Sequence, residues 1–380
     1  MIDLIKLSSE LISFKSVSPK SAGSLEFIKK LLTKYKFQCQ ILEFGQNKVK
    51  NLYAEINGGN GPNLCFAGHT DVVPPGNINE WNSDPFKSSI KGGVLYGRGA
   101  SDMKSAIAAF IFSSIKFLEE NNYLFNGKLS FLLTADEEGD ADFGTKCVVK
   151  WLKKKRGKID FCLVGEPTNP NYLGEMIKVG RRGSLNGEII VNGTQGHVAY
   201  PEKCKNPIDD LLKICNVLNL PLDNGSKLFQ PSNLVITSVD VGNNITNLVA
   251  GQAKIRFNVR FNDKFKSKDI IKILDQRLKK TKANYKIKIK VSGESFFNYS
   301  KKLTDCLTKA IKKTTKKKPQ LSTSGGTSDA RFISEICPVV EFGIVGKTMH
   351  KVNENVKIKD IKKLSEIYHH FIKNFFNGNN

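Results

Sequence analysis

Short apolar runs recur along the first half of the chain, and each one ends in polar or acidic residues. The run at 64–67 is followed by Gly-His-Thr-Asp at 68–71. The runs at 128–134 and 159–164 are followed by Ala-Asp-Glu-Glu and by Gly-Glu-Pro. Apolar stretches of this length that stop at turn-forming residues predict buried strands.

A longer apolar pattern follows a glycine-rich segment at 97–104. Its helical spacing predicts a helix that runs to about Glu119, with Asp102 at the junction between a strand and that helix. Strands and helices alternate in this way to about Val179, which predicts an α/β domain with a parallel or mixed sheet and helices on both faces. The strands of such a sheet end at a common edge, where a site is expected.

From Gly180 the order of elements changes. The expected strands cover 184–191, 233–241, 251–261 and 285–291, and the expected helices cover 207–218 and 267–279. This order predicts an α+β sandwich inserted into the first domain. We therefore expect a first domain made of 1–179 and 293–380 and an inserted domain of 180–292.

Candidate metal ligands stand at the predicted strand ends. They are His69, Asp102, Glu137, Glu138 and Glu166, joined from far downstream by His350. Singly, each has an ordinary explanation, such as a structural histidine, a solvated acidic turn or a helix N-cap. Their repeated placement at strand ends favours a metal site. Nitrogen and oxygen donors without thiolate suit zinc, or less tightly manganese or cobalt.

Two positions near these ligands suggest supporting roles. Asp71 lies two residues after His69, so the two side chains should project from the same face of a strand. Its carboxylate is then expected to hold the second imidazole nitrogen of a metal-bound His69. Glu137 and Glu138 are adjacent and should point in opposite directions. The residues alone leave open which of them is a ligand and which is a base.

Five sequence blocks resemble the M20 family of di-zinc aminoacylases and carboxypeptidases. They cover 68–74, 97–104, 136–139, 165–167 and 349–354, in the order expected for that family. The resemblance implies a zinc-peptidase catalytic domain with an inserted dimerisation domain, and a homodimer. It also implies two Zn²⁺ per subunit, with Co²⁺ as a substitute. His69 and Glu166 would bind one ion, Glu138 and His350 the other, and Asp102 would bridge them.

The resemblance also assigns catalytic roles. Asp71 would orient His69, and Glu137 would be the general base of a metal-assisted amide hydrolysis. His197 would donate a hydrogen bond to the oxyanion of the tetrahedral intermediate. In the family this histidine reaches across the dimer into the partner's site.

Three further blocks, at 180–184, 196–201 and 325–332, resemble one branch of the family. That branch hydrolyses N-succinyl-LL-2,6-diaminopimelate to succinate and LL-2,6-diaminopimelate, in diaminopimelate and lysine biosynthesis. The three carboxylates of this small anionic substrate require arginine forks and hydroxyl or backbone donors. The residues at or near positions that bind substrate in the branch are Arg181, Ser184, Asn247, Arg260, Gly326 and Thr327.

Two departures from the branch bear on specificity. Gly346 stands where asparagine is usual, and 248–251 read Leu-Val-Ala-Gly in place of a Val-Ile-Pro stretch. Alternatives are therefore another M20 amidohydrolase, such as an acetylornithine deacetylase or a metallo-aminopeptidase. A third is a basic binding or scaffold protein that kept the fold and lost catalysis, which the intact ligand set disfavours.

The chain has 380 residues and a net charge of +23, which raises the question of a nucleic-acid partner. Its lysines are scattered, and the richest run, 312–318, has no interleaved aromatic residues. We therefore expect no specific nucleic-acid partner, although a basic surface can steer an acidic substrate. The eight cysteines contain no CxxC pair, and no signal peptide or membrane span is apparent. These features predict a cytoplasmic protein without a membrane partner.

Overall fold

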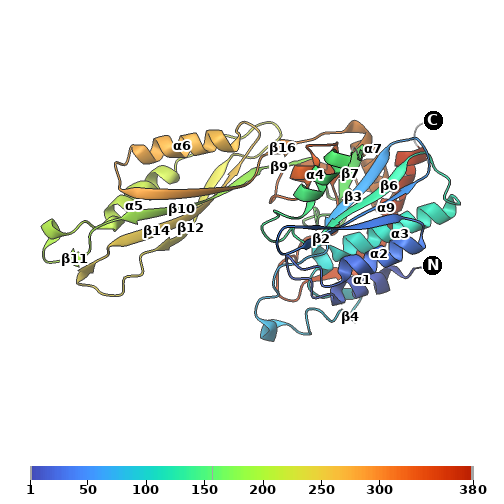
Figure 1. The fold of residues 1–380 in the computed structure, drawn as a ribbon, viewed down its shortest axis with the longest axis horizontal. Coiled ribbons are helices and arrows are strands. Elements are labelled where there is room, and N and C mark those ends of the chain that lie inside the picture. Colours follow the sequence, from blue (N-terminus) through green and yellow to red (C-terminus); the bar gives the residue numbers. More distant parts are fainter. Residues whose placement is uncertain (1, 156, 378–380) are drawn as a thin grey trace. The chain divides into compact units, whose positions relative to one another are not determined.

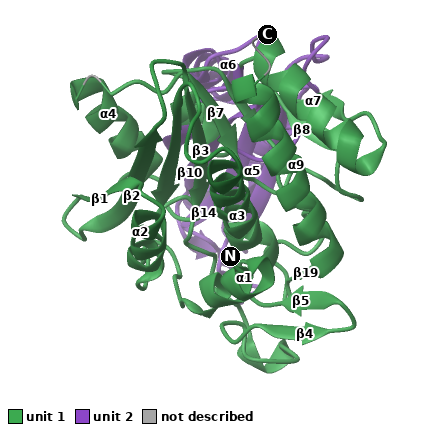
Figure 2. Ribbon diagram, turned by 90° about the vertical axis from the view of Figure 1, so that its right-hand side faces the viewer, with its two compact units in different colours: residues 1–179, 298–322, 328–380 green, residues 180–297, 323–327 purple. Residues whose placement is uncertain are grey.

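The computed structural model describes residues 2–155 and 157–377, which fall into two compact units. Figure 2 colours unit 1, with residues 1–179, 298–322 and 328–380, separately from unit 2, with residues 180–297 and 323–327. Unit 2 thus begins at Gly180, and the chain returns to unit 1 at Asn298. The short segment 323–327 also packs with unit 2, which no local sequence pattern indicates.

The main sheet of unit 1 has eight strands in the order β1-β2-β6-β3-β7-β18-β8-β17 (Figure 1). Their bounds are β1 Gln38–Phe44, β2 Val49–Asn57, β3 Asn63–His69, β6 Lys128–Thr134, β7 Phe161–Val164, β8 Met176–Lys178, β17 Gln320–Ser322 and β18 Val339–Glu341. The central strands β6, β3, β7 and β18 are parallel, as the sequence predicts. β1 and β2 are antiparallel additions and β18 pairs antiparallel with β8, so the sheet is mixed.

Helices cover both faces of this sheet. They are α1 Leu4–Ser13, α2 Ser24–Lys34, α3 Ser105–Glu120, α4 Thr145–Lys155, α7 Lys301–Thr315, α8 Ala330–Ile333 and α9 Ile358–Asn377. Phe66 of β3 stacks on Phe110 of α3 with ring centroids 4.3 Å apart, inside the main core. Alternate residues of a strand face opposite sides. On β2, Leu52 joins that core while Tyr53 packs on the other side against Trp151 of α4.

A small three-stranded sheet completes unit 1. It pairs β4 Ser89–Lys91 with β5 Val94–Tyr96 and β5 with β19 Asn355–Lys357. Through β19 it joins the C-terminal part of the chain to the segment that precedes Asp102. No helix in the described part of the chain is both long enough and apolar enough to cross a lipid bilayer.

Unit 2 is a two-layer α+β sandwich. Its antiparallel sheet has the order β12-β14-β10-β15, with β10 Gly183–Asn192, β12 Asn233–Asp240, β14 Gln252–Phe261 and β15 Tyr285–Gly293. Helices α5 Pro207–Leu218 and α6 Ser267–Lys279 have the bounds that the sequence predicts. The Asn206 side chain caps α5 by accepting from Ile208 N, and Pro207 follows at the first helical position.

The core of unit 2 lies between one face of this sheet and the two helices. Buried positions alternate along β10 and meet Ile214 of α5 and Leu274 of α6. Two short pairings lie beyond the sheet. β9 Gly180–Arg181 pairs with β16 Phe296–Phe297, and β11 Gly196–His197 pairs with β13 Leu248–Val249.

Candidate metal centre

Three parallel strands bring the expected ligands to one edge of the unit 1 sheet. β3 ends at His69, which is in register with Thr134 at the end of β6, and Ala67 is in register with Val164 at the end of β7. The residues that follow β6 and β7 carry Glu137, Glu138 and Glu166. The sequence expectation of one shared edge is therefore met in the geometry of these strands.

Asp102 reaches the same edge from an irregular segment. Its backbone is extended, with φ −125° and ψ 96°, and the regular helix begins only at Ser105. Asp102 Oδ1 lies 3.2 Å from His69 Nε2, and Oδ2 lies 3.4 Å from His350 Nε2. One carboxylate thus faces two imidazoles with its two oxygens, which is the arrangement a bridging ligand needs.

The donor atoms form three overlapping groups, each able to hold a metal ion. The groups are His69 with Asp102 and Glu166, Asp102 with Glu138 and His350, and His69 with Glu137 and Glu138. The first two share Asp102 and contain the five expected ligands. Their imidazole and carboxylate donors suit a borderline divalent cation such as zinc. The residues therefore fit a dinuclear centre.

The position of Asp71 differs in detail from the sequence expectation. Its main-chain carbonyl, and not its carboxylate, lies at hydrogen-bond distance from His69 Nδ1, at 2.9 Å. The nearer carboxylate oxygen is 3.8 Å from that nitrogen. β3 ends before Asp71, so the strand periodicity no longer applies. The carboxylate instead accepts from the backbone N–H groups of Glu137 and Glu138, which fixes the turn that carries both glutamates.

The electrostatics of this edge reflect many carboxylates in a buried place. Burial raises the pKa of Glu137 well above its ordinary value, and the negative charge of Glu166 adds to the increase. Burial likewise raises the pKa of Asp71 to about 6. Hydrogen bonds with Asp102 and Glu138 raise the pKa of His350 to about 10. Metal binding would have to displace that proton, because an imidazole ligand is neutral.

The expected substrate-binding residues other than Asn247 form one cluster where β10 begins. Ser184 of β10 pairs in register with Arg260 of β14, and Asn258 joins them, donating to Ser184 Oγ and accepting from Arg260 Nε. Arg181 donates from Nη1 to the carbonyl of Gly326 at 3.2 Å. Thr327, the next residue, is half-buried. Asn258 is a part of this cluster that sequence reasoning did not identify.

His197 and Asn247 form a second pair elsewhere in unit 2. His197 is exposed and pairs with Leu248, the residue after Asn247. Its Nδ1 accepts from the N–H of Ala199 at 3.1 Å. An imidazole that accepts at Nδ1 carries its proton on Nε2. His197 therefore presents an N–H donor, the group that an oxyanion requires.

These two unit 2 clusters lie at opposite ends of the same sheet. Figure 1 shows β9 and β16 at one end of β10 and β11 at the other. The strand from Ser184 to the end of β10 spans roughly 25 Å at about 3.3 Å per residue. Within one chain, His197 and Arg260 are thus too far apart to contact the same small substrate.

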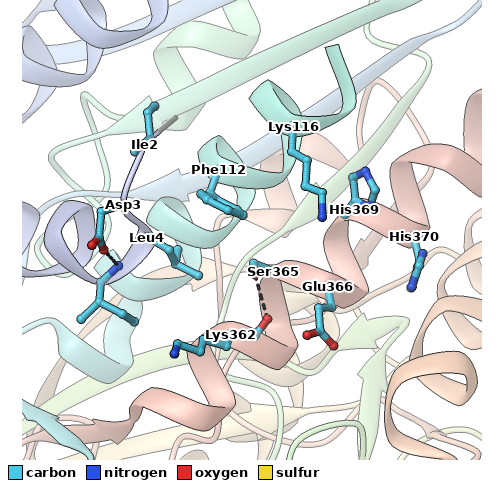
Figure 3. A pocket seen from close by; sticks show the side chains of 11 residues that line it. Ile2, Asp3, Leu4, Phe112, Lys116, Lys362, Ser365, Glu366, His369 and His370 are labelled. Atoms are coloured by element: carbon cyan, nitrogen blue, oxygen red, sulfur yellow. Dashed lines mark hydrogen bonds between the residues drawn. The ribbon is translucent and has the colours of Figure 1, made fainter. Parts of the chain in front are cut away.

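A cavity of about 440 Å³ lies elsewhere in unit 1 and contains none of the expected ligands. Figure 3 shows its wall, formed by the N-terminal residues, α3 and α9. It is lined by Phe112, Lys116, His369 and His370, among others. Cavity size does not identify the chemistry here, because the carboxylates and imidazoles converge at the sheet edge instead.

Comparison with known proteins adds the family. The model of peptidase family M20/M25/M40 matches residues 65–374. The chain belongs to this family. It is 53% identical over 380 residues to a succinyl-diaminopimelate desuccinylase of Pelagibacter ubique, covering 98% of each chain. It is 49% identical to a protein of the same name from Wolbachia pipientis, covering 100% of this chain and 95% of the relative.

Solved structures of the family share the fold at lower identity. An M20 family metallo-carboxypeptidase from Sulfolobus solfataricus superimposes with a TM-score of 0.83 at 20% identity, covering 99% of both chains. A dinuclear metal-binding M20 peptidase from Bacillus subtilis gives 0.69 at 17% identity, covering 97% of this chain and 96% of the other. The expected fold class, an α/β catalytic part with an α+β insertion, is confirmed.

Proposed function

We propose that this chain hydrolyses N-succinyl-LL-2,6-diaminopimelate to succinate and LL-2,6-diaminopimelate. The observation that carries the proposal is the full-length similarity, at about half identity, to proteins named succinyl-diaminopimelate desuccinylase. Family membership and the converging ligand groups support an amide hydrolase that uses metal ions. The eight free cysteines support a reducing compartment, so we propose the cytoplasm.

The proposed cofactors are two Zn²⁺ per subunit, with Co²⁺ able to replace them. His69 and Glu166 would hold one ion, Glu138 and His350 the other, and Asp102 both. The bound ions supply Lewis acidity, which polarises the scissile carbonyl and lowers the pKa of the attacking water. Metal analysis after reconstitution with zinc should give close to two equivalents per chain. Full activity with at most one equivalent would contradict this.

Glu137 is the proposed general base. It stands in the turn fixed by the Asp71 carboxylate, and burial raises its pKa, which makes its carboxylate a stronger proton acceptor. Its carboxylate takes a proton from the water whose oxygen attacks the amide carbon. The same proton then passes to the leaving nitrogen as the carbon–nitrogen bond breaks. Asp71 positions both His69, through its carbonyl, and Glu137, through its carboxylate.

Substrate recognition is proposed to use both clusters of unit 2. Arg181, Ser184, Arg260, Gly326 and Thr327 would bind the substrate carboxylates. His197 and Asn247 would come from the second subunit of a homodimer. The separation of the two clusters within unit 2 supports this division, because one chain cannot present both to one substrate. An arginine fork forms charge-assisted bonds that suit a carboxylate.

A substrate panel tests the proposal. Zinc-loaded protein is assayed with N-succinyl-LL-2,6-diaminopimelate, N-acetylornithine and dipeptides under identical conditions. The expected result is the highest kcat/KM for the succinyl substrate. A preference for acetylornithine or a dipeptide would replace the proposed substrate while leaving the amidohydrolase chemistry in place. Activity toward none of them, with two metals bound, would contradict the proposed function itself.

A further inference from the structure

A buried ion pair lies against the backbone of the candidate ligand Asp102 and contains no expected ligand. Arg98 Nη1 and Glu354 Oε2 are 2.7 Å apart, and their side chains are only 2% and 1% exposed. Arg98 lies in the glycine-rich segment before Asp102, and Glu354 lies four residues after His350. The pair thus joins the two segments that carry the proposed bridging ligand and one terminal ligand.

The Glu354 carboxylate holds the backbone that presents Asp102. Its Oε1 accepts from the N–H groups of Ser101 at 2.8 Å and Asp102 at 3.0 Å. Its Oε2 accepts from Gly99 N at 3.1 Å as well as from Arg98. The N–H groups of Ala100 and Lys104 bond locally, to the carbonyls of Gly97 and Gly99. The N–H groups of Gly99, Ser101 and Asp102 have the Glu354 carboxylate as their acceptor instead. Three of the backbone donors that lead to the Asp102 side chain are therefore held by one distant carboxylate.

Arg98 extends the same connection to two other segments. Its Nη1 donates to the carbonyl of Lys351, the residue after His350, at 3.2 Å. Its Nη2 donates to the carbonyl of Pro74, three residues after Asp71, at 3.3 Å. The indole of Trp81 lies over the guanidinium at 5.2 Å and shields it from water. One guanidinium thus contacts the segments that carry Asp71, Asp102 and His350.

Such a pair is a poor means of stabilising a fold, because removing two charges from water costs about as much as their attraction returns. Its geometry points to a different use. We propose that Arg98 and Glu354 are positioning residues that set the spacing of Asp102 and His350, and thereby the affinity for the two metal ions. The proposal rests on the proposed dinuclear centre. It requires neither residue to touch metal or substrate.

Glu354→Gln tests this with little change in shape. The amide keeps one acceptor oxygen, but its NH₂ group faces backbone donors and the charge that pairs with Arg98 is lost. The expected result is a 10- to 100-fold weaker affinity for zinc in a calorimetric or competitive chelator titration, the scale for losing a residue that orients ligands. The metal-free variant should keep the circular dichroism spectrum of the wild type, although its urea midpoint should fall because the buried guanidinium loses its partner charge. In assays at saturating zinc, the fold decrease in kcat should exceed the fold increase in KM.

Glu120→Gln is the matched control. Glu120 also accepts from a basic side chain, with His369 Nε2 at 2.9 Å, but it lies away from the ligands on α3. Its zinc affinity should equal that of the wild type. Equal affinity for Glu354→Gln, or a lower urea midpoint with unchanged zinc affinity, would overturn the proposal and leave the pair a purely structural role.

Arg98→Lys decides the question if Glu354→Gln does not fold. A lysine keeps the charge near Glu354, but a single ammonium cannot reach the carbonyls of Pro74 and Lys351 in the geometry of the guanidinium. Zinc affinity should again fall at least 10-fold, and unchanged affinity would contradict the proposal. The titrations need no substrate. Failure of the desuccinylase proposal would therefore appear in the substrate panel, whereas failure of this one would appear in the zinc affinities.

Discussion

Asn247 lies beside His197 in unit 2, because its carbonyl accepts a 3.1 Å hydrogen bond from the N–H of Val198. Both are expected site residues, and both lie roughly 25 Å along β10 from Ser184 and Arg260. That separation exceeds the length of a small amino-acid amide. If both clusters act on one substrate, they must come from two copies of the chain. The expected role of the dimer then has a geometric basis within unit 2 alone.

Subunit mixing tests the contribution of His197. His197→Ala should keep metal and dimer but lose on the order of 10²–10³ in kcat, the cost of deleting one oxyanion donor. Mixing it with inactive Glu137→Ala and allowing exchange creates a dimer in which one site lacks both groups and the other lacks neither. Activity should return to up to about half that of the wild type per mixed dimer. The measurement is the rate of succinate release before and after exchange.

A second mixture controls for nonspecific recovery. Glu137→Ala and Glu138→Ala both alter the same site of their own chain, so every site in their mixed dimer carries one defect. This mixture should stay inactive. If the His197→Ala mixture also stays inactive despite proven exchange, His197 serves its own subunit or only the fold.

The adjacent glutamates should separate by phenotype. Glu138 Oε1 lies 2.9 Å from His350 Nε2, in the ligand group that contains Asp102. Glu138→Ala should therefore lose bound metal. Glu137→Ala should keep nearly all its metal and lose nearly all turnover, because the proton acceptor is removed. Metal content by plasma emission, measured beside kcat, checks both. If the two variants exchange phenotypes, Glu137 is the ligand and Glu138 the base. This is a real alternative, because the third ligand group contains Glu137.

Local patterns predict the ends of β3, β6 and β7 well, because buried strands show continuous apolar runs and a polar tip. They predict α5 and α6 to the residue, since the amphipathic stripe and the Asn206 cap are local. They fail where distant contacts decide. Asp102 is extended, and the acceptor for its N–H is Glu354, 252 residues away. In the antiparallel edge strand β1 only Leu42 is buried, so the strand carries a weak apolar signal.

The candidate site follows the same division. Their position at strand ends is enough to indicate His69 and Glu166 as ligands, whereas their roles rest on the resemblance to the family. Strand periodicity places the Asp71 carboxylate on His69, but β3 ends at His69, two residues before Asp71. Asn258 was missed because its link between Ser184 and Arg260 depends on strand register, which the sequence does not specify.

Arg260→Ala should lower kcat/KM, whereas the same substitution at a neighbouring arginine should not. Arg260 lies in the cluster with Ser184. Its loss should lower kcat/KM by a factor that corresponds to about 1–3 kcal/mol of transition-state stabilisation, the scale of a charge-assisted contact. Arg256, four residues earlier on the same strand and face, pairs with Glu188 at the surface and is the matched control. Arg256→Ala should leave kcat/KM unchanged. Equal kinetics for both variants would remove Arg260 from the substrate site.

His369 should make stability depend on pH. Burial lowers the pKa of His369 below its ordinary value of 6.5, and the nearby Glu120 carboxylate opposes this only in part. Between the folded pKa and 6.5 the unfolded chain binds more protons than the folded one, so stability should fall as the pH drops through that window. His369→Gln removes the titration and should flatten this part of the profile. The measurement is the thermal midpoint of chelator-treated protein from pH 8 to 5, which excludes the pH dependence of metal binding.

Glu120→Gln should increase the loss of stability at low pH, because the pKa of His369 then falls further. Although burial opposes the change, the charges of His369 and Lys373 lower the pKa of Glu120, which moves its own titration away from the measured range. Parallel profiles for wild type and His369→Gln would mean that the imidazole titrates alike in the folded and unfolded chain.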